Sequence, residues 1–341
     1  MKDFYISDAS RFENQAITSY FVLVAFSLRD RKGSSGGQYL ALTFADRTGQ
    51  FDARMWEDFA EVLEHCAEGS YVKVQGQVSK YNGKFQITVS KMRSAADSEI
   101  ETADFIPTTK FNVAEMSAEL RGYVAAFKSE PLRKLVLAFL DDPEIGPAFA
   151  TAPAAKRLHH AWIGGLLEHV LHLVRICIAT APFYPEVDPD LLVTGAILHD
   201  MGKVRELSWR SSFDYTLEGQ LIGHISIAQG MLHEKIARMN DSGEKFPDDL
   251  RVLVEHMILA HHGKLEFGSP KLPMTPEAML LSALDDLEAK FAAMRREFAS
   301  AESAGKSPGE TTEWVRSMDR PLFNSQRWLE EPAQEPAGEE K

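Results

Sequence analysis

The hydrophobic period of the chain changes near residue 104, and this change limits what each part can fold into. Before it, apolar and polar residues alternate in short runs, which is the period of a half-buried β-strand. After Val113, apolar residues recur at the spacing of an amphipathic helix. A chain of 341 residues is long enough for about two domains with separate cores. The sequence therefore predicts an all-β domain followed by an all-α domain.

The first part contains predicted strands and one short helix. The strands cover residues 17–28, 39–46, 50–56, 71–78 and 85–89, and the helix covers residues 58–66. Three strands, a helix and two strands are the order of an OB-fold barrel. Residues Leu42–Gly49 and Val72–Gly76 resemble OB domains of the anticodon-binding type, and this resemblance implies a domain that binds nucleic acid.

A basic and aromatic segment lies in the last two predicted strands. Between Tyr71 and Ser94 there are five basic residues and no acidic one. Lysines and arginines beside aromatic rings suit a platform for single-stranded nucleic acid. Each residue alone is explained as well by a solvated sheet face or by an aromatic core. The residues assigned to substrate binding here are Lys73, Lys80, Tyr81, Lys84 and Phe85.

The overall composition excludes some classes of protein. The net charge of −13 argues against a protein that grips nucleic acid through bulk positive charge, although it leaves room for a local basic groove. No apolar run approaches the roughly 20 residues that span a bilayer, and the N-terminus lacks the apolar core of a signal peptide. We therefore expect no membrane partner. The two cysteines, Cys66 and Cys177, do not form a disulfide framework, which fits a reducing cytoplasm.

The change of pattern also predicts domain boundaries. Residues 1–103 form the barrel, residues 104–145 a linker with the first helices, residues 146–300 the helical core and residues 301–341 a C-terminal extension. The last residues, from Glu330 to Lys341, are rich in Glu, Pro and Ala, which is typical of a disordered acidic tail. The sequence leaves the oligomeric state open, and a homo-oligomer is compatible with it.

A histidine and an aspartate stand side by side at the end of an apolar predicted helix. Asp188 is placed to cap this helix, Pro189 suits its first turn and Gly202 is placed to end it. The apolar residues before His199 and Asp200 predict that this end of the helix is buried. A buried carboxylate beside a buried imidazole needs a partner, because desolvation of a charge is costly.

Histidines cluster in the helical part of the sequence. Every histidine except His65 lies between His159 and His262. Each one alone is explained as a core residue or as a cation near a helix end. Together with two aspartates they form the order His, His-Asp, His, His-His, Asp on five successive predicted helices, which is carried by His169, His199, Asp200, His224, His261, His262 and Asp285. Imidazoles and carboxylates without thiolate suit Mn²⁺, Fe²⁺, Co²⁺, Ni²⁺ or Zn²⁺.

This order resembles the HD-domain metal-dependent phosphohydrolases, in which a bundle of helices surrounds a metal centre. Together with the preceding OB domain, it resembles more narrowly the YhaM-type 3′→5′ exoribonucleases. The supporting stretches are Gly164–His169, Leu198–Lys203 and His261–Pro270. The resemblance implies a multidomain fold, with an N-terminal all-β OB-fold barrel and a C-terminal all-α HD-domain helical bundle. It also implies metal-dependent hydrolysis of single-stranded RNA, or DNA, from the 3′ end to nucleoside monophosphates.

The resemblance further implies the metal ligands. The signature ligands of the HD core match His169, His199, Asp200 and Asp285, and the additional histidines of HD proteins with two metal ions match His224, His261 and His262. In those proteins the shared aspartate, here Asp200, bridges the ions, and the family favours Mn²⁺. Two ions about 3.5–4 Å apart activate water and stabilise charge on phosphoryl oxygens. Glu288 stands where many HD proteins have a second aspartate, and Asp285 is preferred to Asp286 as the ligand.

Other residues are assigned around this centre. Asp200 and Lys203 are assigned to catalysis, and the ammonium group of Lys203 can also bind a scissile phosphate. The plain alternative for Lys203 is a helix-end lysine that favours the helix dipole. His159 and His160 are assigned to substrate binding or to orienting a ligand. A last group is expected to support the site, to pack in the core or to lie at the surface: Glu168, His172, His256, His65 and His233.

Two other functions fit the same motifs. One is an HD phosphohydrolase of a nucleotide or cyclic dinucleotide with the OB domain as a regulatory module, although no Gly-Tyr-Pro motif follows His261 and His262. The other is a non-catalytic nucleic-acid-binding protein with a structural metal. The number of candidate ligands argues against it, because a closed tetrahedral site uses fewer.

Overall fold

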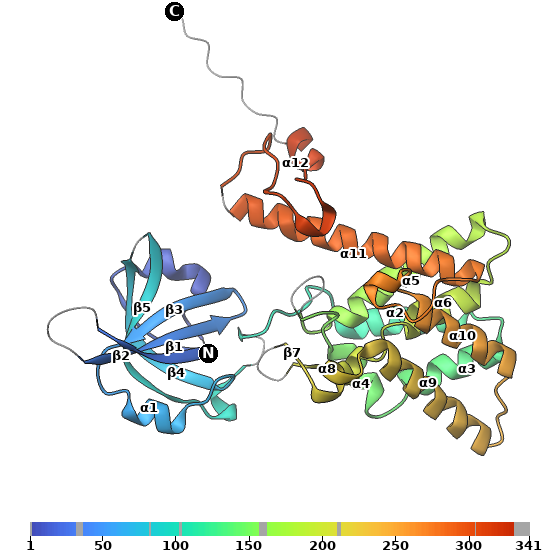
Figure 1. Ribbon diagram of the computed structural model, residues 1–341, viewed down its shortest axis with the longest axis horizontal. Coiled ribbons are helices and arrows are strands. Elements are labelled where there is room, and N and C mark those ends of the chain that lie inside the picture. Colours follow the sequence, from blue (N-terminus) through green and yellow to red (C-terminus); the bar gives the residue numbers. More distant parts are fainter. Residues whose placement is uncertain are drawn as a thin grey trace, which may run out of the picture. The chain divides into compact units, whose positions relative to one another are not determined.

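The computed structural model of the chain describes residues 2–31, 37–81, 83–101, 104–156, 162–209, 213–303 and 305–330. The chain divides into two compact units. The first comprises residues 1–110 with 162–164 and 207–215, and the second comprises residues 111–161, 165–206 and 216–341. The barrel strands belong to the first unit, and the long helices belong to the second (Figure 1).

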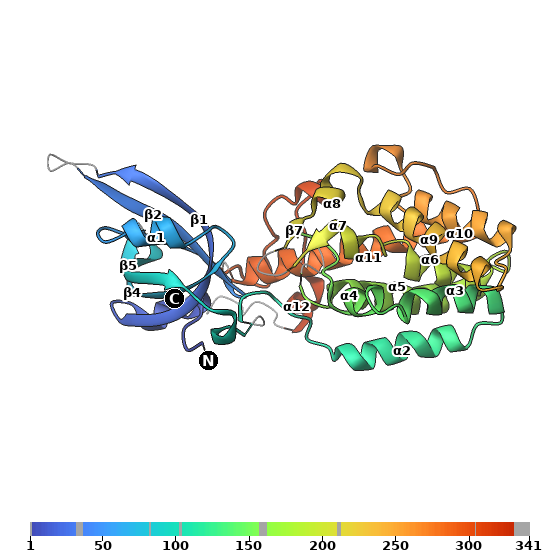
Figure 2. The ribbon, with the colours of Figure 1, turned by 90° about the horizontal axis from the view of Figure 1, so that it is seen from below.

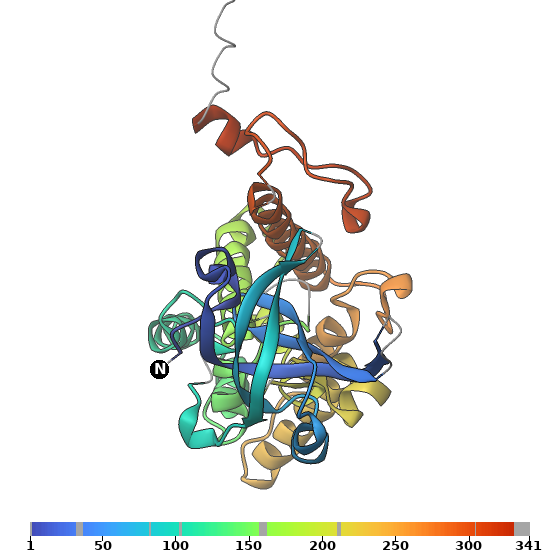
Figure 3. The same cartoon turned by 90° about the vertical axis from the view of Figure 1, so that its left-hand side faces the viewer.

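The first unit is built on a closed barrel with the strand order β1-β2-β3-β5-β4 (Figures 1 and 3). Strands β3 and β5 are parallel, and the other neighbours are antiparallel. The elements are β1 (Ala16–Asp30), β2 (Gln38–Asp46), β3 (Gly49–Met55), α1 (Ala60–His65), β4 (Tyr71–Tyr81) and β5 (Lys84–Ser94). Burial alternates along β2, so that Leu40, Leu42 and Phe44 fill the barrel while their neighbours face outward. The predicted OB-fold barrel is confirmed. Strands β4 and β5 run further than predicted, because their pairing continues to Tyr81 and Lys84 at the turn and, at the other end of β5, as far as Ser94.

A small apolar cluster joins later parts of the chain to the barrel. Phe105 and Ile106 are buried with Val22 of β1, and Ile163 and Phe213 pack against the same three residues. Both Ile163 and Phe213 belong to short segments of the first unit that come from the helical part of the sequence. The chain therefore leaves the barrel unit and returns to it.

The second unit is helical, as predicted. Its helices are α2 (Val113–Ala125), α3 (Glu130–Leu140), α4 (Ile145–Thr151), α5 (Gly165–Thr180), α6 (Pro189–Leu198), α7 (Lys203–Glu206), α8 (Leu217–Leu221), α9 (His224–Asp241), α10 (Asp248–Ala260), α11 (Pro276–Ser303) and α12 (Ser325–Glu330). Helix α11 extends past the other helices of its unit (Figures 1 and 2). Between α7 and α8 in the chain, the short strands β6 (Leu207–Ser208) and β7 (Asp214–Tyr215) pair antiparallel and belong to the first unit; the periodicity did not predict them.

Helix α6 is enclosed by its neighbours. Every residue from Leu191 to Leu198 is buried, and the side chain of Asp188 caps the helix by accepting the backbone N–H of Leu191 at 2.9 Å. The helix ends at Leu198, before Gly202, so the prediction that Gly202 ends it is wrong. Gly202 instead allows a close approach to the start of α9, because a Cβ atom there would lie 2.0 Å from the carbonyl oxygen of His224.

The region of α5 is more apolar than the sequence analysis allowed. Gly165–Phe183 is a 19-residue stretch with a mean hydropathy of 1.4, long and apolar enough to cross a membrane by length and composition. This corrects the expectation that no apolar run approaches that length. Buried residues make up 56% of the tested window, and the core helix of a soluble protein passes the same test. The predicted disordered tail begins at Glu330, which is the last residue of α12, and the rest of it, residues 331–341, lies outside the described residues.

Candidate functional site

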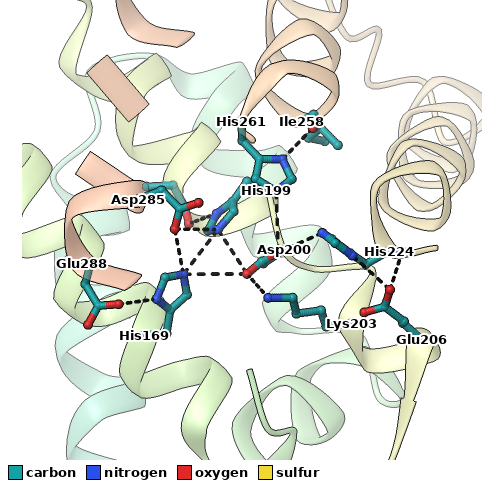
Figure 4. A network of polar contacts seen from close by, with 11 residues as sticks. His169, His199, Asp200, Lys203, Glu206, His224, Ile258, His261, Asp285 and Glu288 are labelled. Carbon is teal, nitrogen blue, oxygen red and sulfur yellow. Dashed lines mark hydrogen bonds and ion pairs between the residues drawn. The ribbon is translucent and has the colours of Figure 1, made fainter. Parts of the chain in front are cut away.

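Helices α5, α6 and α11 bring four of the predicted ligands together. His169 comes from α5, His199 and Asp200 follow the last residue of α6, and Asp285 comes from α11 (Figure 4). The Nε2 atoms of His169 and His199 lie 3.4 Å apart. Asp285 Oδ1 lies 3.3 Å from His169 Nε2, and Asp200 Oδ2 lies 3.3 Å from His199 Nε2. Ligand atoms about 2.1 Å from one tetrahedral ion are about 3.4 Å apart, so this spacing suits a metal.

The start of α9 and the end of α10 bring three further histidines to Asp200. His224 begins α9, and His261 and His262 directly follow α10. One ring nitrogen from each of the three lies within 4.8 Å of the others. Asp200 Oδ1 is 3.4 Å from His224 Nε2 and 3.8 Å from His261 Nε2. These residues form a second group of candidate ligands.

The carboxylate of Asp200 connects the two groups. Its Oδ2 atom faces His169 and His199, and its Oδ1 atom faces His224 and His261. Among the described residues, Asp200 Oδ1 and the Nε2 atoms of His224 and His261 are buried and have no hydrogen-bond partner. A buried polar atom without a partner costs about 1–3 kcal/mol. A cation that binds all three atoms would remove this cost, and imidazole with carboxylate is the donor set of a divalent transition metal.

The charges of the centre are closely coupled. Lys203 Nζ donates to Asp200 Oδ2 at 2.6 Å. Burial would lower the pKa of Lys203, but the Asp200 carboxylate outweighs this effect and the pKa is raised. Burial would raise the pKa of Asp200, but Lys203 and His199 outweigh it and hold the pKa well below its ordinary value. Burial also lowers the pKa of His261, so its imidazole is neutral and able to bind a cation.

Backbone carbonyl groups behind three of the histidines determine which ring nitrogen faces the centre. Each carbonyl accepts the Nδ1 proton, which leaves the lone pair of Nε2 for a metal. The pairs are His199 with Ala196 at 2.9 Å, His261 with Ile258 at 2.7 Å and His262 with Phe267 at 2.8 Å.

Two buried glutamates orient the other two histidines. Glu288 Oε2 lies 2.9 Å from His169 Nδ1. Glu206 Oε1 lies 3.0 Å from His224 Nδ1, and it also accepts the backbone N–H of His224 at 3.0 Å. From the sequence, Glu288 stands out only as a replacement for an aspartate, and nothing in it marks Glu206. No local pattern separates Glu206 from a surface acid, because its contact lies across the fold.

Other candidates lie away from this centre or outside the described residues. Asp286 is exposed and pairs with Lys290 at 2.5 Å. His256 accepts the backbone N–H of Met274 at 2.9 Å. The predicted substrate-binding residues His159 and His160 fall outside the described residues.

The remaining candidates divide between the core and the surface. Glu168 is buried, and His172 Nδ1 lies 3.8 Å from Glu288 Oε1, so His172 stands behind the centre. His65 and His233 are exposed, and His233 pairs with Glu255 at 3.0 Å.

The residues predicted to bind nucleic acid through the barrel do not form one patch. Lys73 lines a groove of about 790 Å³ beside α1, and its Nζ atom lies 5.1 Å from the ring centre of Tyr20. The others (Lys80, Tyr81, Lys84 and Phe85) lie around the turn between β4 and β5. Along β4 this turn is roughly 23 Å from Lys73 at the usual rise per residue. Phe85 packs partly against the barrel core.

A second aromatic and basic surface, which the sequence analysis missed, covers the outward face of β2 and β3. The ring centres of Tyr39 and Trp56 lie 4.8 Å apart. The guanidinium carbon of Arg54 lies 5.8 Å from the ring centre of Tyr39 and 5.0 Å from that of Tyr81. Strands 2 and 3 form the oligonucleotide-binding face of OB-folds, and rings with cations suit base stacking. The available signal was that Arg54 and Trp56 share the outward face of a predicted hairpin.

Comparisons with known proteins cover both parts of the chain. Residues 166–290 match the HD domain family, and residues 22–95 match a family of OB-fold nucleic acid binding domains. The 3′-5′ exoribonuclease YhaM of Halalkalibacterium halodurans is 32% identical over 319 residues, which cover 93% of this chain and 95% of that protein. The 3′-5′ exoribonuclease YhaM of a Geobacillus species is 35% identical over 298 residues, which cover 86% of this chain and 88% of that protein.

Proposed function

The chain belongs to the family of the 3′-5′ exoribonuclease YhaM, and on that basis we propose that it degrades single-stranded RNA to nucleoside monophosphates at a centre of two divalent metal ions. It is a metal-dependent 3′-5′ exoribonuclease with an OB-fold domain and an HD domain. The observation that supports two ions is the position of Asp200. Its two carboxylate oxygens face two different groups of imidazoles, and one of them is buried without a hydrogen-bond partner among the described residues.

Each ion has its own set of proposed ligands. His169, His199 and Asp285 would hold the first ion and His224, His261 and His262 the second, and Asp200 would contribute to both. The resemblance favours Mn²⁺, and the same donors also suit Fe²⁺, Co²⁺, Ni²⁺ and Zn²⁺. When bound, such ions supply Lewis acidity, which activates water near neutral pH and stabilises negative charge on phosphoryl oxygens.

Lys203 is the proposed phosphate-binding residue of the centre. Its side chain is mostly buried, with 13% exposed. Its ammonium group carries its charge at neutral pH, because its pKa is raised by Asp200 although burial would lower it. A point charge beside the bridging carboxylate attracts the scissile phosphate and compensates the charge that develops there. Asp200 therefore holds both Lys203 and the metal ligands in one arrangement.

The outward face of β2 and β3 is the proposed binding surface for the substrate. Single-stranded nucleic acid stacks its bases on Tyr39, Trp56 and Tyr81, and Arg54 contributes charge between the rings. RNA is the expected substrate, and single-stranded DNA is the alternative substrate. We place the protein in the cytoplasm, since Cys66 and Cys177 are buried free thiols.

A single-stranded RNA labelled at its 5′ end tests this function. With Mn²⁺ the protein is expected to shorten the RNA from the 3′ end to a ladder of products, and Asp200→Ala is expected to abolish the ladder. Asp286→Ala is the matched control, because Asp286 is an exposed acid on the same helix as Asp285. It is expected to retain wild-type activity.

Three results would contradict the proposal. Cleavage within the RNA chain would exclude an exonuclease. Turnover of nucleotides or cyclic dinucleotides with the RNA left intact would favour a small-molecule phosphohydrolase. Binding of RNA without cleavage under any divalent metal would favour a non-catalytic binding protein.

A further inference from the structure

The segment that directly follows the candidate ligand His262 exposes apolar side chains. Residues Leu265–Phe267 form a single 3₁₀ turn between α10 and α11. Leu265 is 63% exposed and Phe267 is 54% exposed, so neither side chain is part of the buried core. Exposed apolar side chains that are gathered in one short segment are a feature of binding surfaces.

Several hydrogen bonds order this backbone. Ser269 Oγ, which has one proton to donate, lies 3.0 Å from the carbonyl oxygen of Leu259 and 2.8 Å from that of Lys271. His256 Nε2 accepts the backbone N–H of Met274 at 2.9 Å. The chain that follows the turn is thereby tied to α10 at Ser269 and at Met274. These hydrogen bonds hold the backbone that carries the exposed side chains in a defined conformation.

One contact ties the segment directly to the candidate ligands. The carbonyl oxygen of Phe267 accepts the Nδ1 proton of His262 at 2.8 Å. The residue that carries this exposed ring therefore contacts a histidine of the candidate metal centre through its backbone. Above this ring, Lys264 Nζ lies 4.9 Å from the ring centre. Lys264 also lies 3.6 Å from Glu266 Oε1, but both side chains are mostly exposed and such a pair is weak.

We propose that Phe267 and Lys264 form a nucleotide subsite, in which a base beside the scissile phosphate stacks on the Phe267 ring and Lys264 binds a backbone phosphate. An aromatic face with an adjacent ammonium group matches the two chemical parts of a nucleotide. Because the backbone of Phe267 is hydrogen-bonded to His262, the proposed subsite takes a nucleotide next to the metal centre. This inference rests on the proposed function and adds the residues that recognise the end of the RNA.

Steady-state kinetics of Phe267→Ala and Lys264→Ala test the subsite. Because the backbone carbonyl of residue 267 remains in Phe267→Ala, His262 keeps its orientation and the metal content is expected to be unchanged. Loss of one base stack is expected to raise KM by about 5- to 100-fold with little change in kcat. Phe267→Tyr is expected to restore KM, and Leu265→Ala, which removes an exposed neighbour of the pair, is the matched control.

RNAs that lack one base separate stacking from other effects. In the wild type, an abasic ribose at the last or the next-to-last position is expected to raise KM as much as Phe267→Ala does. In Phe267→Ala the same abasic RNA is expected to cause no further rise. The salt dependence of KM is expected to decrease in Lys264→Ala, since one phosphate contact is lost.

The outcomes distinguish the subsite from the function on which it rests. An active wild type with an unchanged KM in Phe267→Ala, or with equal sensitivity to the abasic RNA in both proteins, overturns the subsite alone. An inactive wild type overturns the proposed function. A changed oligomeric state of Phe267→Ala in light scattering, with unchanged KM per chain, would assign the surface to a second copy of the chain and also overturns the subsite.

Discussion

Replacement of Glu206 by glutamine tests whether the centre holds two ions with separate supports. Glu206 is buried, and its Oε1 atom faces His224 Nδ1 and also accepts the His224 backbone N–H, both at 3.0 Å. Burial would raise the pKa of Glu206, but the hydrogen bond from His224 outweighs it and the pKa is lowered. The carboxylate is therefore ionised at neutral pH. Glutamine keeps the shape of this side chain and removes its charge.

The expected effect is a weaker second ion. Loss of a carboxylate that supports a ligating histidine typically lowers metal affinity by about 10- to 100-fold. This corresponds to about 1.4–2.8 kcal/mol of binding free energy. After dialysis at limiting metal, elemental analysis of Glu206→Gln is expected to show one ion per chain where the wild type shows two. Exonuclease activity is expected to recover when Mn²⁺ is raised by the same factor.

Two further variants complete the experiment. Glu288→Gln is expected to weaken the first ion instead, because Glu288 supports His169 at 2.9 Å. Glu255→Gln is the control. Glu255 Oε1 lies 3.0 Å from His233 Nε2, and neither residue is a candidate ligand. Two tightly bound ions in Glu206→Gln would refute the reasoning. A simultaneous loss of both ions would show one coupled cluster and not two separately supported positions.

Three further expectations follow from the same contacts. Burial would lower the pKa of His169, but the carboxylates of Asp285 and Glu288 outweigh it and raise the pKa to about 10. Metal binding must therefore displace one proton below that pH, so the logarithm of the affinity should rise by about one unit per pH unit, and a flat profile in calorimetric titrations would contradict this. Gly202→Ala would place a Cβ atom 2.0 Å from a backbone oxygen, so the free energy of unfolding in urea should fall by about 1–3 kcal/mol. Gly230→Ala is the control: nothing lies within 4 Å of its Cβ position, and the free energy of unfolding should rise by about 0.5–1 kcal/mol. Trp56→Ala in the Asp200→Ala background should weaken RNA binding by about 1–3 kcal/mol in fluorescence anisotropy, and unchanged binding would remove the β2–β3 face from the interface.

The sequence by itself determined the class of each part and the order of the candidate ligands. Strand and helix periods are local properties, so the barrel and the helical bundle follow from the spacing of apolar residues alone. The ligand order was readable for a different reason. Each histidine stands at a helix start, at a helix end or on a buried helix face, and neighbouring residues mark all three positions.

Only the tertiary structure decided which groups support the ligands and which face the barrel presents. Glu288 and His169 are 119 positions apart, and Glu206 and His224 are 18 apart, so no local pattern connects either pair. Nor does the sequence reveal which oxygen of Asp200 faces which imidazoles, because packing of α6 against its neighbours sets that orientation. On the barrel, the pairing of β3 with β5 and of β5 with β4 brought Arg54 beside Tyr81. Contacts between distant residues depend on how whole elements pack, and that is information a local period does not contain.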